Sequence, residues 1–362
     1  MTETFPLFQD TKPDFADMRQ RWNHYWSGEV YQRPIVLACA PKPGKDWAWG
    51  GCHYGNGIYR KWDEQCARID HWLENIDFLG ELLPSTGPDF GPSQFAAFLG
   101  AELKCVEGSE STSWVDPIID DWSSVLPLRF DAQNHWWRQI LDYCRTLHAH
   151  SRGRYILDIC DLHSNMDALA ALRGDANLCM DLYDEPTLVA EAMRNVRAMY
   201  QPIYDGLYEA SGLSRATGSC GWLPFWCEGK FATIQCDEIC LTSPEMAREY
   251  IIPALEEEAN FLDHCVYHLD GPGTFVHLDD ILSIKRIDAI QWVPGDGQPV
   301  MHTWRDLLHK IHDAGKGLII YSLDCEQVKE IHREFGPRGM VYQPAGTREE
   351  ILELLDWLVA NT

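Results

Sequence analysis

The sequence predicts an α/β fold, a (β/α)8 TIM barrel that carries an N-terminal helix and insertions at one end of its strands. Two observations lead to this prediction. Eight short apolar runs of strand length are spread along the 362 residues, and amphipathic helical patterns lie between several of them. Strands that alternate with helices pair in parallel, and eight of them favour closure into a barrel. We therefore expect a single domain over 1–362, with a helical extension at 1–32 and the barrel at 33–360.

The predicted strands are bounded by turn-forming residues. An amphipathic helix is expected at 14–30, and Arg33 and Pro34 precede the first β-rich run. The eight predicted strands are 35–40, 76–83, 155–160, 215–220, 266–269, 287–292, 317–321 and 340–342.

Four further helices are predicted, at 244–261, 304–314, 326–334 and 347–360. Ser243 is an expected N-cap with Pro244 in the first turn, and Thr347 and Glu350 have the spacing of a capping box.

Two stretches interrupt the regular alternation. The gap at 84–154 begins with a loop rich in Pro and Gly at 84–92, and residues 221–241 resemble a hairpin-like insertion. Each follows a predicted strand, so both are expected where the carboxyl ends of the strands meet, which is where barrel enzymes build their sites.

Composition excludes several classes of function. The chain has 30 basic and 55 acidic residues, and a net charge of −25 opposes binding to nucleic acid or to an anionic membrane surface. We see no export signal at the N-terminus and no run near 18 apolar residues, so we expect a cytoplasmic protein. The 13 cysteines lack CxxC pairs and are expected to be reduced.

Pairs of ionisable residues follow two predicted strands. Residues two apart on a strand face the same side, and this relation holds for His268 and Asp270 and for Asp161 and His163. If both segments are extended, the two pairs point into one site that could share protons or bind a divalent metal. The alternative is that each pair caps a turn. Gly271 to Gly273 predicts a sharp turn directly after Asp270.

Other polar and aromatic residues could complete such a site. Asp237 is a further catalytic candidate, although it and Glu238 could instead cap a helix N-terminus. The predicted substrate-binding residues are Trp47, Trp49, Glu81, Trp222, Trp226, Trp292, Tyr321 and Gln343. Most tryptophans pack in cores, but a cluster of them could box an apolar or quaternary-ammonium methyl donor by cation–π contact.

Several common motifs are missing. Cys220, Cys227, Cys236 and Cys240 have no zinc-finger or zinc-ribbon spacing, and we interpret them as core thiols. No GxGxxG sequence, phosphate loop or GxSxG elbow occurs, so NAD, ATP and serine-hydrolase functions have no support.

Three segments resemble the uroporphyrinogen decarboxylase superfamily, in matching order from about residue 33 to the C-terminus. The helix at 242–253, the strand from Tyr267 to Gly271 and the turn at 345–350 are similar to motifs of that superfamily, and 95–100 resembles a corrinoid-related subgroup. The resemblance implies a (β/α)8 barrel and two activities, which are decarboxylation of a porphyrinogen and methyl transfer between a corrinoid protein and a thiol or methylated compound.

The ligand pattern of the superfamily's zinc methyltransferases is only partly present. His268 matches their histidine ligand, but Asp270 stands where they have a cysteine, and 340–343 contains no cysteine. His268 and Asp270 could still hold zinc or another divalent metal with a further carboxylate or His163. The decarboxylase's arginine-rich substrate motif is not recognisable, which disfavours a porphyrinogen.

Three hypotheses follow. The first is a methyltransferase that moves a methyl group between a small methylated substrate and a thiol or the corrinoid of a partner protein. The second is a lyase or hydrolase, including a decarboxylase, that acts on a small polar compound with a His/Asp acid–base or metal site. The third is a non-catalytic barrel that binds a ligand. The sequence leaves the oligomeric state open.

Overall fold

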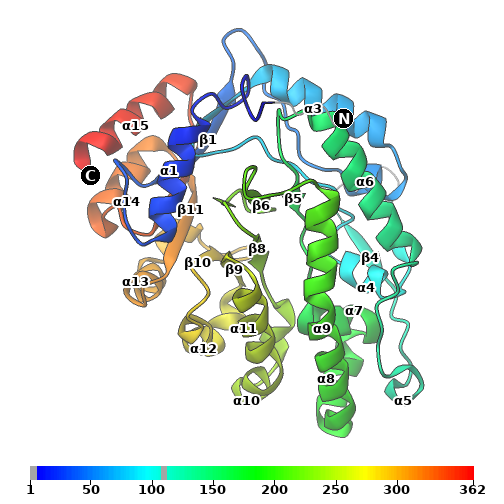
Figure 1. The fold of residues 1–362 in the computed structure, drawn as a ribbon. Helices are drawn as coiled ribbons and strands as arrows, with labels where there is room; N and C mark the ends of the chain where they lie inside the picture. Colours follow the sequence, from blue (N-terminus) through cyan, green and yellow to red (C-terminus); the bar gives the residue numbers. More distant parts are fainter. Residues whose placement is uncertain (1–5, 107–111) are drawn as a thin grey trace.

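The protein has a mixed α/β fold in which helices surround a mostly parallel central sheet (Figure 1). The computed structural model describes residues 6–106 and 112–362, so the first five residues of the predicted 1–32 extension lie outside the described residues. Buried apolar side chains from Phe8 to Leu358 form one hydrophobic core. None of the helices in the described ranges combines the length and apolar character needed to cross a bilayer.

Seven strands form the central sheet in the order β2-β1-β12-β11-β10-β9-β8. They are β1 (Ile35–Pro41), β2 (Ile76–Gly80), β8 (Phe231–Ile234), β9 (His264–Asp270), β10 (Ala289–Val293), β11 (Gly317–Leu323) and β12 (Met340–Pro344). All neighbours are parallel except β1 and β2, which are antiparallel. The parallel arrangement predicted for 76–83 is therefore wrong.

The remaining described strands form two small sheets. One contains β5 (Asp158–Ile159), β6 (Ser219–Gly221) and β7 (Trp226–Cys227), and the other is the hairpin of β3 (Leu103–Cys105) and β4 (Ser113–Val115). No ladder joins β6 to β8 among the described strands, so the predicted closed barrel is not found. The reason is local: β7 folds back antiparallel on β6 and occupies its edge opposite β5.

Single hydrogen bonds join the sheets where a ladder is missing. The Ser219 hydroxyl accepts from the Phe231 amide at 2.9 Å and donates to the Gly229 carbonyl at 2.6 Å, which ties β6 to the start of β8. On the other side of β5, Thr86 N donates to Ile156 O at 3.2 Å. Together with the bonds from Ile156 N to Pro84 O at 3.3 Å and from Asp158 N to Thr86 O at 3.4 Å, it holds the start of the 84–92 loop beside the amino end of β5.

The region 221–241 differs from its prediction as an insertion. It contains β8, which pairs in parallel with β9 and is a strand of the central sheet. All four residues of β8 are buried, so it lacks the alternation that marks a half-exposed strand.

The long helices lie outside the strands in Figure 1. They are α1 (Phe15–Trp26), α3 (Trp62–Asn75), α6 (His135–Ser151), α7 (Asn165–Arg173), α8 (Asp175–Asp184), α9 (Pro186–Ala210), α11 (Ile252–Phe261), α13 (Arg305–Asp313), α14 (Cys325–Phe335) and α15 (Arg348–Asn361). Shorter helices are α2 (Tyr54–Ile58), α4 (Gln94–Phe98), α5 (Trp122–Val125), α10 (Pro244–Met246), α12 (Leu278–Ser283), η1 (Asp237–Leu241), η2 (Ala247–Ile251), η3 (Pro272–His277) and η4 (Met301–Thr303).

The predicted helix signals are confirmed. The Ser243 hydroxyl accepts from Met246 N at 3.3 Å, and Thr347 and Glu350 form the capping box of α15. The predicted helix at 244–261 consists of α10, the single π-turn η2 and α11. All 13 cysteines lie in the described part of the chain, and none of them is joined to another by a disulfide bond.

Candidate functional site

Two groups of possible metal ligands meet at Asp237. The ligand atoms of Asp237, His268 and Asp270 lie within 4.8 Å of one another, and the same holds for His163, Asp167 and Asp237. Asp237 therefore connects the two predicted His/Asp pairs, although they follow strands in different sheets. We call these five residues the His/Asp cluster.

His268 owes its orientation to the register of the sheet. On β9, His268 and Asp270 are alternate residues, and the pairing with β10 places Gln291 beside His268. His268 Nδ1 and Gln291 Oε1 are 2.6 Å apart, and an amide oxygen can only accept. Nδ1 therefore carries the proton, and Nε2 presents a lone pair, as a histidine that binds a metal requires.

Asp270 is the last residue of β9, and the chain turns sharply after it. Gly271 has a φ of +70°, which favours glycine, and its amide donates to the Val293 carbonyl at 2.8 Å. The predicted turn is present, and η3 starts at Pro272.

His163 lies between two carboxylates. Its Nε2 is 2.8 Å from Asp161 Oδ2, and its Nδ1 is 3.5 Å from Asp167 Oδ2. Burial opposes protonation of His163, but the charges of Asp161 and Asp167 outweigh burial and hold its pKa well above the usual value. The contacts with both carboxylates therefore favour the protonated form of the histidine.

The backbone at His163 is not the extended strand that the sequence suggested. β5 ends at Ile159, and His163 and Asn165 have φ angles of +37° and +49°. A left-handed turn, rather than strand alternation, brings Asp161 and His163 together.

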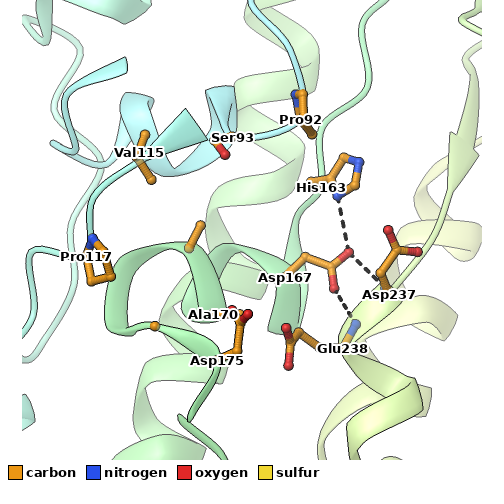
Figure 2. Close-up of a pocket in the computed structure, with 12 residues that line it drawn as sticks. Pro92, Ser93, Val115, Pro117, His163, Asp167, Ala170, Asp175, Asp237 and Glu238 are labelled. Carbon is orange, nitrogen blue, oxygen red and sulfur yellow. Dashed lines mark hydrogen bonds and ion pairs between the residues drawn. The ribbon is translucent and has the colours of Figure 1, made fainter. Parts of the chain in front are cut away.

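Asp167 positions Asp237 through the main chain. The two carboxylate oxygens of Asp167 accept from the amides of Asp237 at 3.1 Å and Glu238 at 3.0 Å, the first residues of η1 (Figure 2). Asp167 thus caps η1, and the alternative function of Asp237 as a helix cap does not apply. None of the described residues donates a hydrogen bond to the Asp237 carboxylate, so it can take another partner.

Desolvation, together with nearby negative charge, raises the pKa of two neighbouring carboxylates, Asp237 and Glu238. Loss of water around Asp237, together with the neighbouring Asp167, raises its pKa to about 6, against the opposing charges of His163 and His268. Desolvation and Asp175 raise the pKa of Glu238 to about 7. A bound cation would reverse both effects, since it favours the charged form of each carboxylate.

Two cavities flank the cluster. The smaller, about 410 Å³, is lined by His163, Asp167, Asp237 and Glu238, together with residues of the 92–117 region (Figure 2). The larger, about 910 Å³, is lined by the loop at 47–54, the loop at 82–89 and the carboxyl ends of β5, β11 and β12. Five predicted substrate-binding residues line the larger cavity, namely Trp47, Trp49, Trp222, Tyr321 and Gln343.

Trp222 connects the larger cavity to the His/Asp cluster. Its ring meets the ring of His268 edge to face, with centroids 5.3 Å apart and an angle of 74°. Trp222 lines the cavity, whereas His268 does not. A ligand in the cavity that packs on Trp222 would therefore lie close to His268.

Three predicted substrate-binding residues lie elsewhere. Glu81 is fully buried, and its carboxylate pairs with Arg33 and Arg21. Trp226 is also fully buried, and its Nε1 donates to Thr217 O at 2.9 Å. Trp292 packs in the core against Phe275 and Trp304. None of the three lines the larger cavity, because each side chain is directed into the core.

Three residues of the site were not predicted. Asp167 lies four positions after His163, a spacing that a helix brings together. Gln291 could be found only from the register of β9 and β10. Asp89 lies in the 84–92 loop that the sequence marked as a site loop, yet nothing distinguished it from the other polar residues there.

Comparisons with known proteins bear on the fold. No model of a protein family matches the chain, and no curated protein matches it. Among solved structures, the chain is similar to a methyltransferase from Methanosarcina mazei, with a TM-score of 0.59, 12% identity and coverage of 95% of this chain and 98% of that chain. At this identity the similarity shows a shared fold, and the chemistry must be argued from the residues.

Proposed function

We propose that this protein is a metal-dependent methyltransferase related to the uroporphyrinogen decarboxylase superfamily. It would move a methyl group between a small methylated compound and a nucleophile, which is a thiol or the corrinoid of a partner protein. The similarity to a solved methyltransferase over nearly the whole chain supports this proposal at the level of the fold.

The observation that carries the proposal is the convergence of Asp237, His268 and Asp270. Their ligand atoms are close enough to share one ion, and the Gln291 contact leaves His268 Nε2 free to bind it. One imidazole and two carboxylates suit zinc or another divalent transition metal. Because Asp270 replaces a cysteine, the zinc-thiolate centre of the superfamily's methyltransferases does not fit here.

Each polar residue of the cluster has a separate role in this proposal. Asp237, His268 and Asp270 would hold a divalent ion, which supplies Lewis acidity to polarise a bound thiol or leaving group. His163, held as a cation by Asp161 and Asp167, is a fixed positive charge beside the site. Trp222 would pack the methyl-bearing group against the His268 side of the larger cavity.

The transfer needs no oxidant. The methyl carbon leaves without its bonding pair, the leaving group keeps that pair, and the nucleophile supplies the pair of the new bond. Because the carbon carries positive charge in transit, a surrounding of carboxylates and aromatic rings stabilises the transition state.

Metal analysis combined with a transfer assay tests the proposal. We expect about one equivalent of zinc or another transition metal in the purified protein, and loss of that metal in His268→Ala and Asp237→Asn. With a methyl-corrinoid protein and a panel of acceptors, the wild type should change the corrinoid absorbance spectrum, and His268→Ala should not. His135→Ala, an exposed histidine of α6, is the matched control and should behave as the wild type. Metal-free protein that still transfers methyl groups would contradict the proposal.

A lyase or hydrolase is the second candidate, and one observation favours it. Burial raises the pKa of Asp89 to about 7, with Gly91 N and Gln94 as hydrogen-bond donors. A carboxyl that titrates near neutrality can act as a general acid or base. A bell-shaped pH profile with metal-free protein, abolished in Asp89→Asn, would select this function over methyl transfer.

A further inference from the structure

The larger cavity combines aromatic walls with uncompensated negative charge. Among the described residues that line it, two are aspartates and none is Lys, Arg or His. Its aromatic side chains are Trp47, Trp49, Tyr54, Trp72, Trp222 and Tyr321. A cavity of about 910 Å³ with this lining suits a ligand that is apolar on its surface and positively charged.

We propose that the larger cavity binds a small organic cation, a methylated ammonium compound, as the methyl donor. This inference rests on the proposed function for the identity of the reaction, but the binding itself follows from the cavity. It narrows the proposed substrate from any small methylated compound to a positively charged one.

Asp158 is the first of the two carboxylates that lack a partner of opposite charge. It lies on β5 and is half-buried, and its Oδ1 is covered without a hydrogen-bond partner among the described residues. A buried, unpaired carboxylate oxygen is costly unless a ligand supplies the missing positive charge.

Asp89 is the second carboxylate, on the loop opposite β5. Its Oδ1 accepts from Gly91 N at 2.7 Å and from Gln94 Nε2 at 2.9 Å, which fixes its orientation. These donors are neutral, and Asp89 forms no ion pair with any described residue. Asp89 and Asp158 thus present two carboxyl groups to one cavity without an opposing charge, and a bound cation would favour the ionised form of both.

The aromatic walls explain why a methylated ammonium fits better than a metal ion or a primary amine. A quaternary ammonium cannot donate a hydrogen bond, and the faces of Trp and Tyr rings attract it within about 6 Å of the ring centroid. Trp47 and Trp49 are 57% and 63% exposed, so a ligand could bury apolar ring surface that now faces solvent. A bare metal ion would gain no such burial.

The same lining excludes anionic substrates. A polycarboxylate such as a porphyrinogen would meet Asp89 and Asp158 without any described basic residue in the cavity to balance them. The chain's net charge of −25 would further slow the approach of an anion and steer a cation inward.

Methyl transfer from such a ligand is balanced. The N–CH3 bond of a quaternary ammonium breaks, the tertiary amine keeps the electron pair, and the thiolate or corrinoid of the proposed function supplies the pair of the new bond. No proton or oxidant is consumed. Trp222 lines this cavity and its ring contacts the ring of His268, so a methyl group packed on Trp222 lies near the proposed metal ligand.

Calorimetric titration of the full-length protein with an isosteric pair of probes tests the inference. Choline and 3,3-dimethylbutan-1-ol have the same shape, but only choline is charged. We expect choline to bind at least about tenfold more tightly, with quenching of tryptophan fluorescence. This comparison uses the wild type, so it does not depend on whether any variant folds.

Two variants then locate the charge. Asp158→Asn and Asp89→Asn should each weaken choline binding by about tenfold and leave 3,3-dimethylbutan-1-ol binding within about twofold. Asp313→Asn, an exposed aspartate of α13, is the matched control and should bind both probes as the wild type does. Circular dichroism confirms that each variant is folded.

The outcomes separate this inference from the proposed function. Equal affinity for choline and its neutral isostere, or tighter binding of 3,3-dimethylbutanoate, would overturn the cation inference even if methyl transfer from a neutral donor were observed. Selective binding of choline that depends on Asp158 would support the inference even if no methyl transfer were detected, and the proposed reaction alone would then be at fault.

Discussion

Glu81 and Asp158 show two opposite ways of burying a carboxylate in one protein. Glu81 follows β2 and accepts from Arg33 at 2.6 and 2.8 Å, from Arg21 at 3.1 Å and from the Val36 amide at 3.0 Å. Asp158, on β5, has one covered oxygen without a hydrogen-bond partner, and no cation among the residues that the structure describes lies beside it. The first carboxylate is fully satisfied inside the protein, and the second is not.

The difference indicates where a ligand is needed. In a chain with 30 basic and 55 acidic residues, two arginines are directed to Glu81 and none to the larger cavity. Burial raises the pKa of Asp158 to about 7, which means that ionising this carboxyl costs free energy in the folded protein. A bound cation would remove that cost. We infer that the ion pairs of Glu81 maintain the fold, whereas the unpaired Asp158 marks a place for a ligand.

Removing the Glu81 carboxylate should give the largest effect. Glu81→Ala leaves Arg33 buried and uncompensated, and we expect a loss of about 3–5 kcal/mol in the free energy of unfolding, measured in urea at pH 7. Adding Arg33→Met should restore part of this loss, because the double change removes both charges. An effect below about 1 kcal/mol would show that the ion pair is not structural.

Both carboxylates lie within predicted strands, 76–83 and 155–160, and only Glu81 was singled out from the sequence, as a substrate-binding residue. Glu81 and Arg33 are 48 positions apart, and their contact depends on the antiparallel pairing of β1 and β2, which the sequence suggested to be parallel. The same limit affects the barrel prediction. Apolar runs identify strands, whereas closure depends on whether β7 or β8 takes the edge of β6.

The site was predictable where it follows from strand geometry. The alternation of His268 and Asp270 on β9 needs only a period of two, and the turn at Gly271 follows from its sequence. The contribution of Asp237 to the cluster was a hypothesis, and its position depends on backbone bonds to Asp167 some 70 residues earlier. Such long-range contacts leave no local pattern in the sequence.

A substitution at Gln291 tests the candidate metal site rather than the fold, and its expected effect is smaller than that of Glu81→Ala. Gln291→Leu removes the acceptor for His268 Nδ1, and we expect metal affinity to fall about 10- to 100-fold, since such supporting partners typically contribute that much. Competition with a chromophoric chelator measures the change. Gln291→Glu keeps an acceptor at the same place and should bind metal at least as well as the wild type. If both variants bind metal equally, His268 does not depend on this contact.

The smallest expected effect is the change in the free energy of unfolding when the Asp158 charge is removed. Removing the Glu81 charge should destabilise the protein, whereas removing the Asp158 charge should stabilise it. Desolvation, aided by Asp89 and opposed by Ser85, raises the pKa of Asp158 to about 7, above the unfolded value of about 3.9. The folded state therefore binds the proton more tightly, and the group's contribution to stability is lost as pH rises from about 4 to 7.

Asp158→Asn is neutral at every pH and escapes this loss. We expect it to be more stable than the wild type at pH 8 by on the order of 1 kcal/mol, reduced from the full shift because the carboxyl partly faces the cavity, and to lose this advantage near pH 4. Urea unfolding at pH 4.5 and pH 8 measures the difference, with Asp313→Asn as the control. Saturating choline should abolish the wild type's disadvantage at pH 8, because the bound cation places a positive charge beside Asp158. Glu81 needs no such ligand, because Arg33 and Arg21 already neutralise it. A variant less stable than the wild type at pH 8 would mean that Asp158, like Glu81, is satisfied within the protein.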